Sequence, residues 1–204
     1  MRTILLAAAA ALALAAPALA EAPQPGPGED VAVFATGCFW CTESDFEKVP
    51  GVIDVVSGYI GGSVDNPTYQ QVSGGGTGHA EAVKVRFDPA RVTYEQLLDK
   101  FWHTTDLLDG GGQFCDRGDQ YRSEIFYVGD EQKRLAEESK AAIEASGRFG
   151  QPIATGIAPA TTFWPAEGYH QDYARLNPVR YTYYRWACGR DQRLEALWGK
   201  PAAS

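Results

Sequence analysis

Two cysteines three positions apart are the first residues in this chain that could do chemistry. Cys38 and Cys41 enclose two aromatic residues in the stretch "GCFWC", directly after the apolar run Val31–Thr36. If a helix begins near Gly37, its free N–H groups and its dipole favour a thiolate on Cys38, which makes this thiol a candidate nucleophile with a lowered pKa. Residues three apart lie on one helix face, so the two sulfurs can meet.

The same spacing is compatible with two other uses of cysteine. A thioredoxin-type redox pair and half of a zinc site both contain two cysteines at this distance. The zinc interpretation is weak because Cys115 and Cys188 lie 73 positions apart and do not form a second such pair. The histidines do not show a ligand spacing either.

The aromatic residues of this motif indicate a pocket. Phe39 and Trp40 flank the sulfur of Cys38, and both rings cannot point into the core at once. At least one is expected to line a pocket beside the sulfur, where it suits a small apolar or sulfur-bearing group.

Glu81 is a candidate proton donor. It lies in the alternating segment Ala80–Phe87, on the same face as Val83, Val85 and Phe87. Burial on that face raises the pKa of a carboxyl group, so that it holds a proton near neutral pH and can act as a general acid. A wet or salt-bridged carboxylate at the strand's end fits the periodicity equally well.

The elements that position these residues alternate in type. Strands are predicted at 31–36, 52–59, 80–87 and 123–128, and helices at 38–48, after a capping box formed by Thr93 and Gln96, and at 131–146. Residues 61–78 are predicted to be a glycine-rich loop, and the pattern fades into aromatic loops after Gly147. The order predicts an α/β domain of two layers.

The N-terminus has the features of a secretory signal. Arg2 precedes an apolar stretch that ends in the small residues of Ala18-Leu19-Ala20. We therefore expect cleavage after Ala20 and a periplasmic or secreted protein. In this organisation residues 21–30 are a flexible tether, residues 31–199 are one catalytic domain, and residues 200–204 are a tail.

Charge and hydropathy narrow the range of partners. The chain has 18 basic and 26 acidic residues and a net charge of −8; loss of residues 1–20 removes one base and no acid, which gives −9. Nucleic-acid binding depends on clustered Lys and Arg, so we do not expect it. Since no segment approaches the roughly 20 apolar residues of a membrane span, we expect no membrane partner. We also expect the protein to be a monomer.

Six motifs, in order, carry a resemblance to a known family. They are "GCFWC", "SGYIGG", "NPTYQQV", "GHAEAVKV", "GGQFCDRGDQYRSEIF" and "EGYHQDY", and together they resemble the peptide methionine sulfoxide reductases of the A type, which act on the S epimer. The match runs from about Val31 to Gly199. It implies a two-layer α/β fold related to the ferredoxin-like plait, no metal, no organic cofactor, and a thioredoxin-like dithiol as reductant.

The resemblance also implies roles for single residues. Cys38 is expected to attack the sulfoxide, in free methionine sulfoxide or in oxidised proteins, and Glu81 to protonate its oxygen. The residues expected around the substrate are Phe39, Trp40, Tyr69, Asp116, Tyr121 and, in "EGYHQDY", His170. Cys115 stands where the family often has Asn, and Cys41 where many members have Gly.

An oxidised Cys38 needs a second thiol to clear its sulfenic acid. Cys41 is a local partner, whereas Cys188 would need the C-terminal segment to fold over the site. Because family members do use C-terminal resolving cysteines, Cys188 stays a competitor. We predict that Cys41 resolves and that Cys115 and Cys188 form a structural disulfide, as leftover cysteines of exported proteins usually do.

Two functions from other classes stay open at this point. A general thiol-disulfide oxidoreductase would use Cys38 and Cys41 without regard to sulfoxide. A module that binds Met-rich exported proteins without turnover would not need Cys38.

Overall fold

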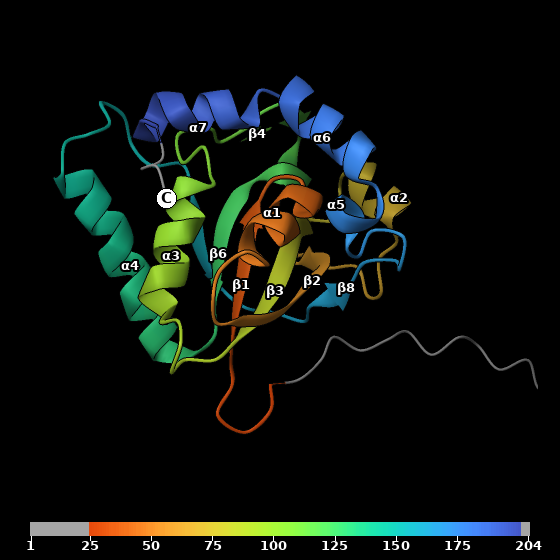
Figure 1. Cartoon of the computed structure of the whole chain (residues 1–204), viewed down its shortest axis with the longest axis horizontal. Coiled ribbons are helices and arrows are strands. Elements are labelled where there is room, and N and C mark those ends of the chain that lie inside the picture. Colours follow the sequence, from red (N-terminus) through yellow and green to blue (C-terminus); the bar gives the residue numbers. More distant parts are fainter. Residues whose placement is uncertain (1–24, 201–204) are drawn as a thin grey trace, which may run out of the picture.

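The computed structural model describes residues 25–200 and centres on a six-stranded sheet (Figure 1). The strand order is β7-β6-β1-β3-β2-β8. Neighbouring strands are antiparallel except β6 and β7, which are parallel. The bounds are β1 Asp30–Thr36, β2 Val52–Ile60, β3 Ala80–Phe87, β6 Ser123–Tyr127, β7 Gly156–Pro159 and β8 Trp164–Pro165.

The inner four strands have the order and directions of a ferredoxin-like plait. These four strands lie side by side in the order β6, β1, β3, β2. Counted along the chain, this is the order fourth, first, third, second. Helices α1 (Phe39–Phe46) and α3 (Tyr94–His103) make the two crossovers, β1-α1-β2 and β3-α3-β6. The predicted two-layer α/β fold related to this plait is confirmed.

The helices form the second layer. Helices α1, α3 and α4 (Gly129–Ala145) pack on one face of the sheet, where the main core contains Phe34, Phe46, Val85 and Phe101. The predicted capping box of α3 is present, with Thr93 and Gln96 bonding each other's backbone N–H groups. Helices α6 (Pro178–Ala187) and α7 (Arg190–Trp198) run across one end of the sheet (Figure 1).

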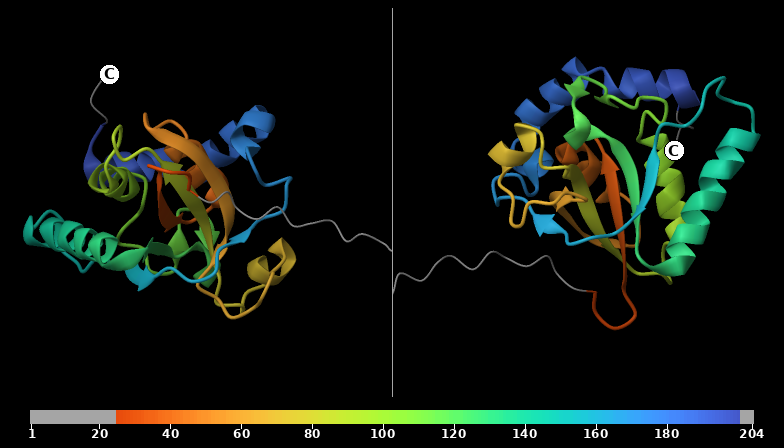
Figure 2. Two further views of the ribbon diagram at one scale, coloured as in Figure 1. Left: turned by 90° about the horizontal axis from the view of Figure 1, so that it is seen from below. Right: turned by 180° about the vertical axis from the view of Figure 1, so that it is seen from behind.

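The other face of the sheet is covered by the chain itself. Because β7 and β8 lie at opposite edges, the link between them must cross the sheet, as the right-hand view of Figure 2 shows. Ala158, Ala160 and Phe163 pack there against a smaller core that includes Ala80 and Ala82. The predicted alternation along β3 is therefore confirmed, and both of its faces are buried.

The C-terminal part differs from the sequence prediction. The segment after Gly147, predicted as loops, forms two edge strands and α5 (Tyr173–Leu176), α6 and α7. The loop predicted at 61–78 contains α2 (Tyr69–Ser73), which begins with its own capping box. These helices are short or bury few residues, so their apolar periodicity is weak. The two-residue strands β4 (Gly112–Gln113) and β5 (Asp116–Arg117) pair as a hairpin, followed by a 3-10 turn at Asp119–Tyr121.

The expected signal segment 1–20 lies outside the described residues, as do residues 21–24 and 201–204. The end of the expected tether is ordered, since β1 begins at Asp30 and Glu29 forms an ion pair with Arg86 at 2.9 Å. Within residues 25–200, none of the helices has the length and apolar character needed to cross a bilayer.

Candidate active site

Cys38 lies at the turn from β1 into α1. It is the N-cap residue of α1, so the predicted position at a helix start is confirmed. Gly37 permits the turn because it has a φ of +87°, and a Cβ there would lie 2.5 Å from the Cβ of Gln113. The backbone carbonyl of Cys38 accepts a hydrogen bond from the Thr42 hydroxyl at 3.2 Å, which ties the turn to the next turn of the helix.

The two thiols of the motif form a buried, hydrogen-bonded pair. Cys38 is 5% exposed and Cys41 is 2% exposed. Burial raises the pKa of Cys38 well above its ordinary value, and the hydrogen bond with Cys41 and the nearby Glu81 carboxyl raise it further. The hydrogen bond from Cys38, with the charges of Arg190 and Arg185, lowers the pKa of Cys41 to about 7. The predicted lowering of the Cys38 pKa is therefore wrong for the resting pair, in which Cys41 is the thiol with the lowered pKa.

Glu81 lies beside the start of α1. Its side chain is buried, and its carboxyl oxygen accepts a hydrogen bond from the backbone N–H of Phe39 at 3.1 Å. Burial raises the pKa of Glu81 to about 8 despite this hydrogen bond. The interpretation of a wet or salt-bridged carboxylate is wrong, and the group is mostly protonated at neutral pH.

Aromatic rings surround the helix start. Phe39 is buried and its ring centroid lies 4.9 Å from that of His170. Trp40 is partly exposed, stacks on Tyr173 at 3.7 Å, and meets Tyr184 edge to face at 5.8 Å. Phe39 is thus in the core and Trp40 is partly exposed, which agrees with the expectation that both rings cannot point into the core at once.

The structure also brings together the polar residues expected at the site. Tyr69 and Tyr121 are hydrogen-bonded to each other. Burial and the nearby Glu81 carboxyl raise the pKa of both phenols, so both stay protonated and can donate. Asp116 accepts a hydrogen bond from the hydroxyl of Tyr184 and is partly buried, which raises its pKa.

Tyr184 is a site residue that the sequence did not single out. Its hydroxyl interacts with both Asp116 and the sulfur of Cys38. The sequence placed Tyr184 among the packing aromatics of "RYTYYRWACGR", with one ring possible at the rim of the site. Its helical phase in α6 distinguishes it from the exposed Tyr183, and that helix was not predicted.

His170 is held as a neutral ring. The indole N–H of Trp40 donates to Nδ1 of His170 at 3.0 Å, so the proton of the neutral ring lies on Nε2. Burial lowers the pKa of His170. Nε2 is buried and has no hydrogen-bond partner within residues 25–200. Glu167, which the sequence missed, positions the same segment by accepting from the Tyr59 hydroxyl at 3.0 Å and the Tyr69 backbone N–H at 2.8 Å.

The second cysteine pair is bonded. Cys115 and Cys188 form a disulfide with a Cα–Cα distance of 4.8 Å, which confirms the predicted pairing. Their sulfurs are therefore not available as zinc ligands beside Cys38 and Cys41. In this state Cys188 is not a free thiol, whereas Cys41 is free and in contact with Cys38.

The site thus places a buried cysteine beside a carboxyl group with a raised pKa and beside an aromatic wall. The family profile described as "Peptide methionine sulfoxide reductase" matches residues 30–202. The chain belongs to this family.

Three similar proteins illustrate the relationship. The chain is 56% identical over 168 residues to the peptide methionine sulfoxide reductase MsrA/MsrB of Vibrio cholerae, a match that covers 82% of this chain and 44% of that protein. It is 51% identical over 171 residues to MsrA of Bacillus licheniformis, covering 84% and 94% of the two chains. The crystal structure of reduced Mxr1 from Saccharomyces cerevisiae has 32% identity and a TM-score of 0.68, covering 81% and 93%.

Proposed function

We propose that this protein reduces the S epimer of methionine sulfoxide, free or in oxidised proteins, to methionine. The observation that carries the proposal is the contact at the start of α1, where the Phe39 N–H joins the Glu81 carboxyl to the turn that holds Cys38. A nucleophilic sulfur and a protonated acid are thereby fixed beside one aromatic wall. A sulfoxide needs both, since it is a poor electrophile until its oxygen is protonated or strongly hydrogen-bonded.

The first step transfers oxygen from the substrate to Cys38. The thiol proton of Cys38 passes along the hydrogen bond to Cys41, whose pKa of about 7 leaves it about half ionised at neutral pH. Glu81 protonates the sulfoxide oxygen while the Cys38 sulfur takes that oxygen, which breaks the S–O bond of the substrate. Methionine leaves, Cys38 becomes a sulfenic acid, and Glu81 becomes a carboxylate.

The phenols and the rings orient the substrate in this scheme. Tyr69 and Tyr121 lie close enough to Glu81 for its carboxyl to raise the pKa of both phenols, and they donate to the same oxygen. Phe39 and Trp40 contact the methyl group on the substrate sulfur with their apolar rings, next to the polar groups that bind the sulfoxide oxygen.

The oxidised enzyme returns to its dithiol form through a second thiol and an external reductant. Attack of Cys41 on the Cys38 sulfenic acid gives a disulfide and water, and a thioredoxin-like dithiol reduces that disulfide. The signal-like character of residues 1–20 supports export to the periplasm or the medium. The mature protein then works as one domain over residues 31–199.

The test is an assay of the mature protein with the S and R epimers of methionine sulfoxide and a dithiol, with a Cys38→Ser variant as control. We expect reduction of the S epimer only, and no turnover by the variant. Reduction of insulin disulfides without activity on either epimer would indicate a general thiol-disulfide oxidoreductase instead. N-terminal sequencing of the exported protein tests cleavage after Ala20.

A further inference from the structure

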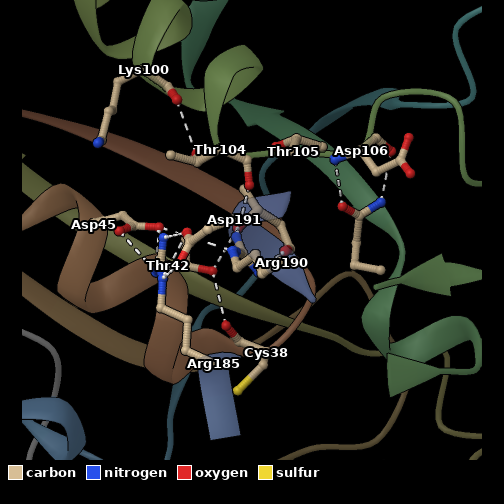
Figure 3. A network of polar contacts seen from close by, with 12 residues as sticks. Cys38, Thr42, Asp45, Lys100, Thr104, Thr105, Asp106, Arg185, Arg190 and Asp191 are labelled. Atoms are coloured by element: carbon tan, nitrogen blue, oxygen red, sulfur yellow. Dashed lines mark hydrogen bonds and ion pairs between the residues drawn. The ribbon is translucent and has the colours of Figure 1, made fainter. Parts of the chain in front are cut away.

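Arg190 is a buried cation in the polar network that also contains Cys38 and Thr42 (Figure 3). Its side chain is 2% exposed, and its guanidinium donates to the Thr36 carbonyl at 3.2 Å, the Thr36 hydroxyl at 3.0 Å and the Thr104 carbonyl at 2.7 Å. The Thr36 hydroxyl in turn bonds that of Thr42, the residue after Cys41. Arg190 therefore spans the β1–α1 turn on the side where Cys41 lies.

The hydrogen bonds of Arg190 do not neutralise its charge. All three acceptors are uncharged oxygens, its Nε has no hydrogen-bond partner within the described part of the chain, and the nearest carboxylate, Asp45, is 4.0 Å away. Asp45 is already shared with Arg185, which bonds both of its oxygens at 3.0 Å. A buried cation without a full counter-charge is costly, so a negative charge nearby is stabilised.

Charged and titratable groups from several elements surround the thiol of Cys41. Cys38 and Asp45 come from the start and the body of α1, and Glu81 from β3. Tyr181 and Arg185 come from α6 and Arg190 from α7. Lys100 of α3 adds a further positive charge on the Asp45 side. Glu81 and Tyr181 are protonated at neutral pH, since burial raises the pKa of Glu81 to about 8 and of Tyr181 to about 12. Asp191 of α7 bonds Arg185 at 2.7 Å, so Arg185 is paired with two carboxylates, whereas Arg190 has no carboxylate in hydrogen-bond contact. Cys41 lies one helical turn before Asp45 on the same face of α1, so its sulfur is the further anion on which the Arg190 charge acts.

The Cys115–Cys188 disulfide joins the two chain segments that lie next to Arg190. Cys188 ends α6 and is separated from Arg190 only by Gly189, which has a φ of +67°. Its partner Cys115 follows Phe114, whose ring centroid lies 4.5 Å from the guanidinium carbon of Arg190. The disulfide therefore joins two segments of the chain. One segment carries the Arg190 cation, and the other carries the Phe114 ring that packs against it.

We propose that Arg190, held by the Cys115–Cys188 disulfide, stabilises the thiolate of Cys41 and so speeds its attack on an oxidised Cys38. In this step Cys41 loses its proton, a sulfur–sulfur bond forms, and the S–O bond of the Cys38 sulfenic acid breaks. The departing hydroxide takes up a proton and leaves as water, so Cys41 is oxidised as the sulfenic sulfur is reduced. Arg190 is a positioning residue in this scheme, and the inference extends the proposed reductase cycle to its second step.

The test separates the two steps in Arg190→Met. Enzyme without reductant is mixed with the S-sulfoxide, and methionine release, sulfenic acid trapped by dimedone, and the Cys38–Cys41 disulfide are followed by quenching and mass spectrometry. We expect the disulfide to form about tenfold more slowly at pH 7 once Cys38 is oxidised, and the trapped sulfenic acid to accumulate. Methionine release also uses the Cys41 thiolate, so it is followed separately and is not the readout of this step. The pH midpoint of disulfide formation should move upward, and Arg190→Lys should restore part of the rate.

Two further comparisons make the result decisive. Arg193→Met changes an exposed arginine of the same helix, whose partner is the buried carboxylate of Asp106, and it should leave disulfide formation unchanged. A peroxide arm, in which hydrogen peroxide oxidises Cys38 directly, measures the second step even if the protein does not reduce sulfoxides. If Arg190→Met does not fold, the Cys115→Ala/Cys188→Ala variant takes its place and should also slow this step. Wild-type rates and pH midpoints in the variant that folds would overturn the proposal.

Discussion

The backbone N–H of Phe39 donates to the carboxyl of Glu81 at 3.1 Å, so the first residue of α1 and the second residue of β3 are directly joined. Cys38 immediately precedes Phe39, so this one contact sets the position of the acid relative to the nucleophile. A substrate oxygen that receives the Glu81 proton is then close to the sulfur that attacks.

Glu81→Gln removes the acid and keeps the shape of the side chain. We expect the rate of the first methionine release to fall by about 10²- to 10⁴-fold, because the amide cannot give up a proton to the sulfoxide. In wild type this rate should fall as the pH rises through about 8, the pKa to which burial raises Glu81. Single-turnover rates between pH 6 and 10 check this; an alkaline limb that persists in Glu81→Gln would rule out this assignment.

The same substitution has a consequence for stability. The folded pKa of Glu81, about 8, lies above its value in the unfolded chain, so the protonated group favours the folded state at low pH and this benefit is lost as the pH rises toward 8. Glu81→Gln should therefore gain stability relative to wild type between about pH 5 and pH 8. Denaturant unfolding at both ends of this range measures the difference, and a constant difference would argue against a buried, titrating carboxyl.

The resting thiolate should belong to Cys41. The hydrogen bond from Cys38 lowers the pKa of Cys41 to about 7, whereas burial raises that of Cys38. A titration followed by ultraviolet thiolate absorbance should show a step near pH 7 in wild type. Cys41→Ser should lose the step, and Cys38→Ala should show it at higher pH because the hydrogen-bond donor to Cys41 is gone. A step that survives in Cys41→Ser would place the charge on Cys38.

Cys41 should also be the thiol that clears the sulfenic acid. Cys41→Ser is expected to release one methionine per molecule and then stop with Cys38 oxidised, since the other cysteines are bonded to each other. Peptide mapping of wild type after one turnover should give a Cys38–Cys41 disulfide. A peptide that joins Cys38 to Cys188 would instead make the C-terminal cysteine the resolving thiol.

The parts of the fold that follow regular periodicity could be predicted from the sequence. The alternation of Ala80–Phe87 gave the strand with its bounds, and the Thr93 capping box gave the start of α3. The pairing of Cys115 with Cys188 followed from elimination in a chain expected to be exported, and it is confirmed.

What could not be predicted depends on burial and on contacts between distant segments. Cys38 lies at a helix start, as expected, yet its pKa is raised because the thiol is buried and lies near Cys41 and Glu81. Arg190 and Tyr184 reach the thiols only because α6 and α7 cross the end of the sheet. Neither helix has an apolar stripe strong enough to be recognised from its own residues.

The Cys115–Cys188 disulfide should contribute to stability as well as to the site. It closes a loop of about 70 residues, for which the chain-entropy model gives a stabilisation of ~4 kcal/mol. Cys115→Ala/Cys188→Ala should lower the free energy of unfolding by an amount of this order, measured by denaturant unfolding of both proteins without reductant. Reduction of wild type should have a similar effect, and a double variant as stable as wild type would show that the bond does not restrain the unfolded chain.

Trp40→Phe should change the protonation of His170. The indole N–H can only donate, so its bond to Nδ1 holds that nitrogen unprotonated, and burial lowers the pKa of His170 as well. Phenylalanine keeps an aromatic ring to stack on Tyr173 but leaves Nδ1 without its donor, at a cost of about 1–3 kcal/mol in unfolding free energy. The pKa of His170, followed by NMR of its ring protons, should rise in the variant, and activity should fall at acid pH where wild type still works. His103→Gln, a change at an exposed histidine on α3, serves as the control and should leave the His170 titration unchanged. If His170 titrates alike in wild type and Trp40→Phe, the indole does not set its protonation state.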